Sequence, residues 1–198
     1  MVQRFVDPKE KLLGYLIILI IALLFIGGFW YNYQFKKLDN SSIIYQKILN
    51  NSPISLITAE DFIKNNNNIY GTLISLNIAK EYVDKQDFYK AELQLKQGLK
   101  TISDVNLQSI LKLRLARIQL QQKKINEALY ILKSIKGITW RDIVADLEGD
   151  AWLSKGNFYK AYESWYNGIA VTTSPIMKQI MKFKMNNLPE SVQKSFNS

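Results

Sequence analysis

Three carboxylates in one short stretch are the side chains of this sequence best placed for chemistry. Asp142, Asp146 and Asp150 follow one another at intervals of four residues, so on a helix they would share one face. Carboxylate oxygens are the ligands that hard cations prefer, which makes a cation site one interpretation of the spacing. A single helix supplies all three, however, and this favours a solvated helix face over a cation site.

The residue types that most often perform catalysis or bind metals are absent. The 198 residues include no Cys and no His. Their absence removes disulfides, thiolate zinc sites and thiol nucleophiles, together with the commonest general base and the commonest transition-metal ligand. Tyr, Lys, Asp and Glu remain, but no paired constellation of them stands out. We therefore expect no enzymatic activity, no catalytic residues, no metal and no cofactor.

The positive charge of the chain is almost all lysine. Lys and Arg number 26 against 17 Asp and Glu, which gives a formal net charge of +9. Arginine occurs only as Arg4, Arg114, Arg117 and Arg141. A nucleic-acid surface more often clusters arginine on one face, so nucleic acid is not an expected partner.

An uncharged run near the N-terminus, LLGYLIILIIALLFIGGFWY (Leu12 to Tyr31), predicts a membrane anchor. As a helix it would span about 30 Å, the thickness of the hydrocarbon core of a bilayer. Trp30, Tyr31 and Tyr33 lie where an interfacial aromatic belt belongs. A buried core helix would show a polar stripe, and a signal peptide would have a shorter apolar region and a cleavage site. We expect residues 12–33 to be an uncleaved anchor in the lipid bilayer.

The basic residues on either side of the run predict its orientation. Arg4, Lys9 and Lys11 precede it, whereas Lys36 and Lys37 follow it. By the positive-inside rule, residues 1–11 would form a short cytoplasmic tail. The domain that follows the anchor would then lie on the opposite side of the membrane. Residues 34–41 are expected to be a linker.

The tetrapeptide FYKA occurs twice, at 88–91 and 158–161, and indicates an internal repeat. After Lys37 the apolar residues recur at helical spacing, and no strand-like alternation is seen. Ala91, Ala128 and Ala161 stand 37 and 33 residues apart. Each has a large residue four positions later and a small one twelve positions earlier: Leu95, Leu132 and Trp165, and Ala79, Ala116 and Gly149. Two antiparallel helices need this pattern, since a small residue permits close approach and bulky neighbours fill the flanking space.

A period of about 34 residues is that of the tetratricopeptide repeat (TPR). We therefore expect an all-α fold, in which the N-terminal transmembrane helix is followed by a tetratricopeptide-like array of helical hairpins over residues 42–188. The first-helix Trp and the terminal Pro of the motif are missing, so a generic helical-hairpin protein is the alternative. Residues 41–65 would form a degenerate hairpin, residues 174–188 a closing helix, and residues 189–198 a flexible tail. Asp104 is expected to cap one helix and Pro175 to open the last one.

Several longer blocks carry a resemblance to one family. They are NIYGTLISLNIAKEYVDKQDFYKAELQLKQGL, LRLARIQL, WRDIVADLEGDAWLSKG and MKFKMNNL, which together cover most of residues 68–188. In these blocks and their order the chain resembles the YfgM family, the ancillary subunits of the bacterial SecYEG translocon. The resemblance implies a single-pass inner-membrane protein with a periplasmic TPR-like domain that associates with the Sec translocon and with the membrane-anchored periplasmic chaperone PpiD. It also implies assistance to emerging proteins, and it brings no catalytic residues.

The first helix of each repeat supplies most of the inner face of such an array, which suits an extended or helical peptide. Ten residues of these helices are candidates for a protein-binding groove: Leu73, Leu76, Lys80, Ile110, Leu113, Arg114, Arg117, Ile143, Asp146 and Asp150. Some of the apolar ones would instead belong to the core, and the charged ones to a solvated face. A narrower hypothesis is that Arg114 and Arg117 hold an acidic group of a partner.

Two non-enzymatic functions fit these features. The first is a membrane-tethered interaction module at the translocon, which assists emerging periplasmic or outer-membrane proteins together with a periplasmic chaperone. The second is a TPR scaffold for another envelope assembly, such as a secretion or cell-division complex, because the fold alone does not distinguish the two. The family blocks favour the first.

Overall fold

The computed structural model describes residues 8–50 and 55–197, and every regular element in these ranges is helical. The chain divides into two compact units, residues 1–51 and 52–198. The elements are α1 (Pro8–Asn50), α2 (Leu56–Asn65), α3 (Ile69–Asp84), α4 (Phe88–Thr101), α5 (Val105–Gln121), α6 (Ile125–Lys133), the 3₁₀ turn η1 (Ile138–Trp140), α7 (Arg141–Ser154), α8 (Phe158–Val171), α9 (Pro175–Asn186) and α10 (Glu190–Asn197). The all-α class is confirmed.

The first unit is a single helix of 43 residues, α1. Its large apolar side chains from Tyr15 to Leu38 are exposed, and Phe25 and Phe29 are 77% and 78% accessible. In the part of the chain that the structure describes, this is the one helix long and apolar enough to cross a membrane. Exposed apolar side chains on a helix without a polar stripe are those expected when lipid is the solvent.

Residues 34–41, expected as a linker, are helical and continue α1 as far as Asn50. This segment contains neither Pro nor Gly, so nothing in it stops a helix. Ser41 Oγ donates to the Lys37 carbonyl at 2.8 Å, within the helix. Residues 1–7 of the predicted tail and residues 51–54 of the predicted degenerate hairpin lie outside the described residues.

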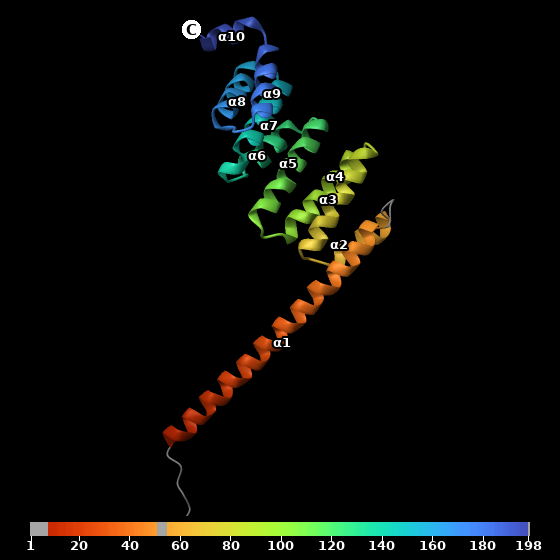
Figure 1. Ribbon diagram of the computed structural model, residues 1–198, viewed down its shortest axis with the longest axis vertical. Coiled ribbons are helices and arrows are strands. Elements are labelled where there is room, and N and C mark those ends of the chain that lie inside the picture. The colour runs from red at the N-terminus through yellow and green to blue at the C-terminus, as the bar shows by residue number, and fades with distance from the viewer. Residues whose placement is uncertain (1–7, 51–54, 198) are drawn as a thin grey trace, which may run out of the picture. The chain divides into compact units, whose positions relative to one another are not determined.

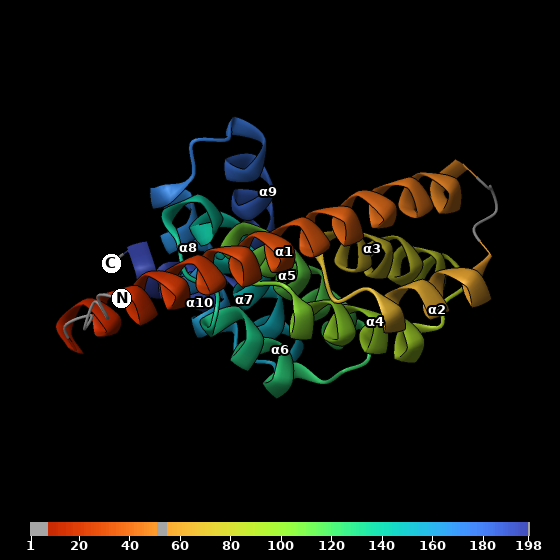
Figure 2. The ribbon, with the colours of Figure 1, turned by 90° about the horizontal axis from the view of Figure 1, so that it is seen from below.

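The second unit is built from three helical hairpins, α3–α4, α5–α6 and α7–α8, in which consecutive helices pack against each other (Figure 1). Helix α2 packs against α3 at one end of the unit (Figure 2), and α9 packs against α8 near the other. The predicted closing helix is thus present as α9. Its first residue is Pro175, and Asp104 accepts a hydrogen bond from the Leu107 amide at 2.7 Å, so both predicted helix starts are confirmed.

The turn inside each hairpin has the same backbone geometry. Gln86, Lys123 and Gly156 have positive φ values of 59°, 61° and 73°. In each turn the next residue donates to the carbonyl five positions back: Asp87 to Tyr82, Lys124 to Gln119, and Asn157 to Trp152, at 2.8, 2.8 and 2.9 Å. This is the Schellman ending of a helix. It recurs at 37 and 33 residues, the intervals of the marker alanines, which confirms the repeat.

The marker alanines lie where paired helices approach most closely. Ala91, Ala128 and Ala161 are fully buried, as are the large residues four positions after them. In the third copy glycine replaces the small alanine of the preceding helix, because the large residue there is tryptophan. A Cβ added to Gly149 would lie 2.5 Å from Cδ1 of Trp165. The packing predicted from the spacing is therefore confirmed.

Residues 189–198, expected as a flexible tail, include the short helix α10. The ring of Phe196 stacks on Tyr162 and Tyr159 of α8, with centroid distances of 4.2 and 4.5 Å. Aromatic pairs of this kind contribute about 0.5–1.5 kcal/mol beyond the area they bury. This contact holds α10 against α8.

A buried carboxylate joins the first two repeats. Glu92 on α4 accepts from Lys124 at 2.6 Å, from Lys96 at 2.7 Å and from the Gln122 amide at 3.0 Å. Burial by itself would raise the pKa of Glu92, but the hydrogen bonds from Lys124, Lys96 and Gln122 outweigh it and lower the pKa from 4.5 to about 2. The charged form is therefore the one that the fold stabilises.

Glu92→Gln is expected to lower the free energy of unfolding by about 1–3 kcal/mol at neutral pH, a range that allows for screening of the partly exposed Lys96 and Lys124. Because the folded-state pKa of Glu92 is depressed, its stabilisation is complete above about pH 4.5 and is lost as the pH falls towards 2. Urea unfolding of the full chain in detergent, followed by circular dichroism across this pH range, measures the difference.

The matched control is Glu190→Gln, which removes an exposed pair with Lys194 and should change stability by less than about 0.5 kcal/mol. If the difference in free energy of unfolding between the wild type and Glu92→Gln stayed constant from neutral pH down to pH 2, this would contradict the lowered pKa of Glu92.

Candidate functional site

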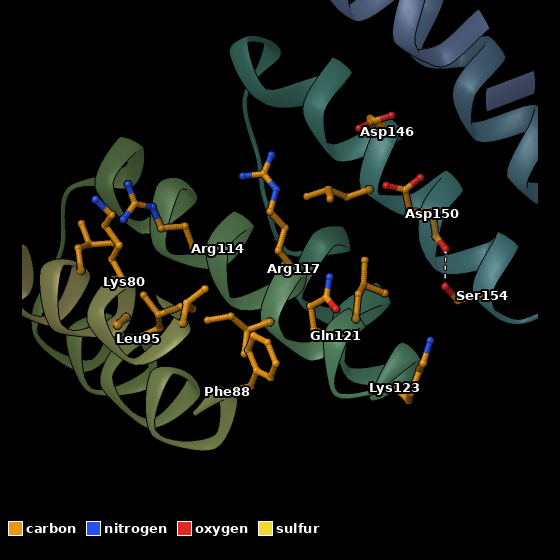
Figure 3. A pocket seen from close by; sticks show the side chains of 16 residues that line it. Lys80, Phe88, Leu95, Arg114, Arg117, Gln121, Lys123, Asp146, Asp150 and Ser154 are labelled. Carbon is orange, nitrogen blue, oxygen red and sulfur yellow. Dashed lines mark hydrogen bonds between the residues drawn. The ribbon is translucent and has the colours of Figure 1, made fainter. Parts of the chain in front are cut away.

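The second unit contains a groove of about 900 Å³ (Figure 3). Its lining comes mainly from α3, α5 and α7, which are the first helices of the three repeats, with further contributions from α4 and from the turn at Lys123. The Schellman turns fix how each first helix meets its partner, so the same helix face is presented three times. This volume lies towards the upper end of the range for small-molecule pockets, and it accommodates several side chains of a peptide.

The floor of the groove is apolar. Its side chains come from all three first helices and from α4: Leu76, Ala79, Val83, Phe88, Leu95, Ile118, Leu120 and Leu147. Leu95 is fully buried, and Leu76, Ala79, Ile118 and Leu147 are nearly so. The floor is therefore made largely of side chains that also pack in the core.

The rim of the groove carries exposed cations. Figure 3 shows Lys80 and Arg114 on one side and Asp146 and Asp150 on the other, with Arg117 between them. Lys80, Arg114 and Arg117 are all exposed. In the described ranges, none of these three takes part in an ion pair shorter than 4.0 Å.

The acidic side of the groove is occupied by a lysine from α9. Lys184 Nζ lies 2.6 Å from an oxygen of Asp146 and 2.8 Å from one of Asp150. Burial raises the pKa of Asp150, and the charge of Asp146 acts in the same direction, whereas Lys184 and Arg117 oppose the shift. Asp150 also has its carbonyl bonded by Ser154 Oγ at 2.9 Å.

The three aspartates spaced by four residues do not converge on one point. Asp142 accepts from Thr172 Oγ1 at 2.8 Å, while Asp146 and Asp150 share the ammonium of Lys184. The positive charge beside the latter two is thus supplied by the protein itself.

Of the ten residues predicted from the sequence, six line the groove: Leu76, Lys80, Arg114, Arg117, Asp146 and Asp150. The other four do not. Leu113 is buried in the core cluster of α5, α6 and α7, and Ile143 packs against that cluster. Leu73 and Ile110 are partly buried and lie outside the lining.

Several groove residues are not among the ten that the sequence predicts. Phe88 and Leu95 belong to the second helix of their repeat, and the sequence predicted only a packing role for them. Lys123 lies in the turn between α5 and α6. Lys184 comes from the closing helix, and only its spacing of 34 and 38 residues from the two aspartates, close to one repeat period, could have indicated the pairing.

Repeated helical hairpins around an apolar groove with a charged rim define a class of protein, the tetratricopeptide-like interaction domains. The family model described as "Tetratricopeptide repeat-like domain" matches residues 4–190. No solved structure matches the chain significantly.

Curated relatives are similar over nearly the whole chain. A protein of Escherichia coli (strain K12) named "Ancillary SecYEG translocon subunit" is 39% identical over 191 residues, covering 94% of this chain and 93% of the relative. A protein of the same name from Buchnera aphidicola subsp. Acyrthosiphon pisum is 32% identical, with 92% and 96% covered. Another, from Aggregatibacter actinomycetemcomitans, is 33% identical, with 88% and 90% covered. The chain belongs to this family, the YfgM family of ancillary SecYEG translocon subunits.

Proposed function

We propose that this chain is a non-enzymatic, membrane-tethered interaction module that works beside the SecYEG translocon. In this proposal it assists periplasmic or outer-membrane proteins as they emerge, together with a PpiD-like membrane-anchored periplasmic chaperone. The observation that carries the proposal is the groove over three repeats, attached to a helix apolar enough for a membrane. The names of the relatives supply the translocon as the partner.

The proposed topology is a single pass through the bacterial inner membrane, with the N-terminus in the cytoplasm and the second unit in the periplasm. The basic residues before the apolar run support this orientation. Tethering also explains how a weak groove contact suffices, because a partner in the same membrane is present at a high effective concentration.

Photocrosslinking in living cells tests the proposal. A photoreactive amino acid at Lys80, Arg117 or Asp150 is expected to give crosslinks to Sec channel subunits or to a periplasmic chaperone. Crosslinks to a periplasmic protein would also require the proposed topology. The control position is Tyr130 on α6, which is 77% exposed and outside the groove, and should not give the same products.

Two results would count against the proposal. Crosslinks only to copies of the chain or to division or secretion-complex proteins would favour the envelope scaffold instead. The same products from Tyr130 as from the groove positions would remove the groove from the function.

A further inference from the structure

We infer that the groove selects acidic segments that also carry apolar side chains. This inference rests on the proposed function, because it names the kind of segment that the interaction module would bind. It goes beyond peptide binding in general, because it predicts discrimination between segments of the same apolar content and opposite charge.

The first argument is charge complementarity at the rim. Lys80, Arg114 and Arg117 project from two helices over one groove, and none has an ion-pair partner within 4.0 Å among the described residues. Like charges held together without partners repel one another, and an anion placed among them relieves this repulsion. Arginine adds planar donors that match a carboxylate in geometry.

The second argument is that the two carboxylates of the groove are already paired within the protein. Asp146 and Asp150 alone would repel an acidic segment, but Lys184 lies within 2.8 Å of both. Arg117 also acts electrostatically on Asp150. The single ammonium of Lys184 compensates one of the two negative charges. The four cations of the lining, Lys80, Arg114, Arg117 and Lys123, outnumber its two carboxylates, so the groove as a whole presents more positive than negative charge to a ligand.

The third argument is the apolar floor, which distinguishes a peptide from a free anion. Val83, Phe88 and Leu120 line the same groove as the cations and are only partly buried. A small anion leaves this surface in contact with water, whereas a segment with Leu or Phe side chains covers it and gains from the burial. A nucleic-acid single strand would need aromatic platforms for its bases, and Phe88 is the one aromatic residue in the described lining.

The test uses the full chain in nanodiscs and two fluorescent peptides of about fifteen residues, long enough to supply helical anchors. The peptides share their Leu and Phe positions and carry either Glu or Lys at the others. Anisotropy titrations should show that the Glu peptide binds at least roughly tenfold more tightly than the Lys peptide. This preference should shrink as the salt concentration rises from about 0.05 to about 0.5 M. Empty nanodiscs correct for binding of either peptide to lipid.

Charge reversal in the groove gives the decisive comparison. The triple variant Lys80→Glu, Arg114→Glu and Arg117→Glu should lose at least roughly tenfold in affinity for the Glu peptide. The matched control is Lys64→Glu, Lys136→Glu and Lys178→Glu, three exposed lysines outside the groove with the same change in formal charge. The control should stay within about twofold of the wild type at moderate salt, where distant charges are screened.

The milder variants Arg114→Gln and Arg117→Gln keep the test valid if the triple variant does not fold. Each should weaken binding of the Glu peptide but not of the Lys peptide. Equal binding of both peptides to the wild type would overturn the inference. Equal losses of affinity for the Glu peptide in the groove triple variant and the control triple variant would overturn it as well. Either result would leave the proposed function standing. Failure of the photocrosslinking experiment, with the charge preference intact, would instead remove the translocon partnership.

Discussion

Trp165→Ala is expected to lower the free energy of unfolding of the second unit by about 3–5 kcal/mol, the range for deleting a fully buried large aromatic side chain. Trp165 is completely buried, and its indole Nε1 donates to the Asp146 carbonyl at 3.1 Å. The residue that faces it is Gly149, which has no side chain to fill the space that Trp165 would leave. Urea unfolding in detergent, followed by circular dichroism, measures the loss.

Tyr130→Ala is the matched control, because Tyr130 is an exposed aromatic residue on α6 and its removal should change stability by less than about 0.5 kcal/mol. The loss of stability for Trp165→Phe should lie between those for Trp165→Ala and Tyr130→Ala, since phenylalanine keeps most of the apolar volume but not the hydrogen bond. A loss for Trp165→Ala no larger than that for Tyr130→Ala would show that the third hairpin does not depend on this contact.

The double variant Ile21→Arg and Leu24→Arg is expected to release the chain from the membrane. Each substitution replaces an exposed apolar side chain near the centre of the uncharged run. On insertion scales, arginine at the centre of a spanning helix is less favourable than Ile or Leu by about 3–4 kcal/mol per residue. Membrane flotation and carbonate extraction of cells expressing the variant should therefore find the chain in the soluble fraction.

Ile43→Arg with Ile44→Arg is the control for composition, because both side chains are exposed on the same helix but beyond the uncharged run. This control is expected to remain with the membrane. Retention of the Ile21→Arg and Leu24→Arg variant in the membrane fraction would refute the anchor.

The repeat could be predicted from the sequence because its determinants are local and periodic. A small residue, a large residue one turn later and a turn at fixed distances specify one hairpin whatever surrounds it, and three copies made the pattern visible. Ala91 and Trp165 therefore occupy the expected places. The change from apolar to polar composition after the uncharged run predicts the end of a helix, but α1 continues through residues 34–41, because helix formation does not depend on that change.

The groove was harder to predict, because the pattern of an apolar helix face does not specify which other helix packs against it. Leu76 and Leu113 hold equivalent positions in the repeat, yet Leu76 lines the groove and Leu113 lies in the core. Helical periodicity distinguishes buried from exposed positions but not a core from a groove floor. Lys184 could not be predicted for a different reason, since its contacts join the closing helix α9 to the third repeat.

The length of α1 has a consequence for where the second unit is attached. The run from Leu12 to Tyr31 accounts for about 30 Å of hydrocarbon, and residues 32–50 extend the same helix by about 28 Å at 1.5 Å per residue. In the proposed topology, with the helix upright, Asn50 would lie well outside the field of charged lipid headgroups, which decays over about 8 Å at physiological ionic strength. In the proposed topology helix α1 would therefore also serve as a spacer, because its length sets the distance between the lipid surface and Asn50.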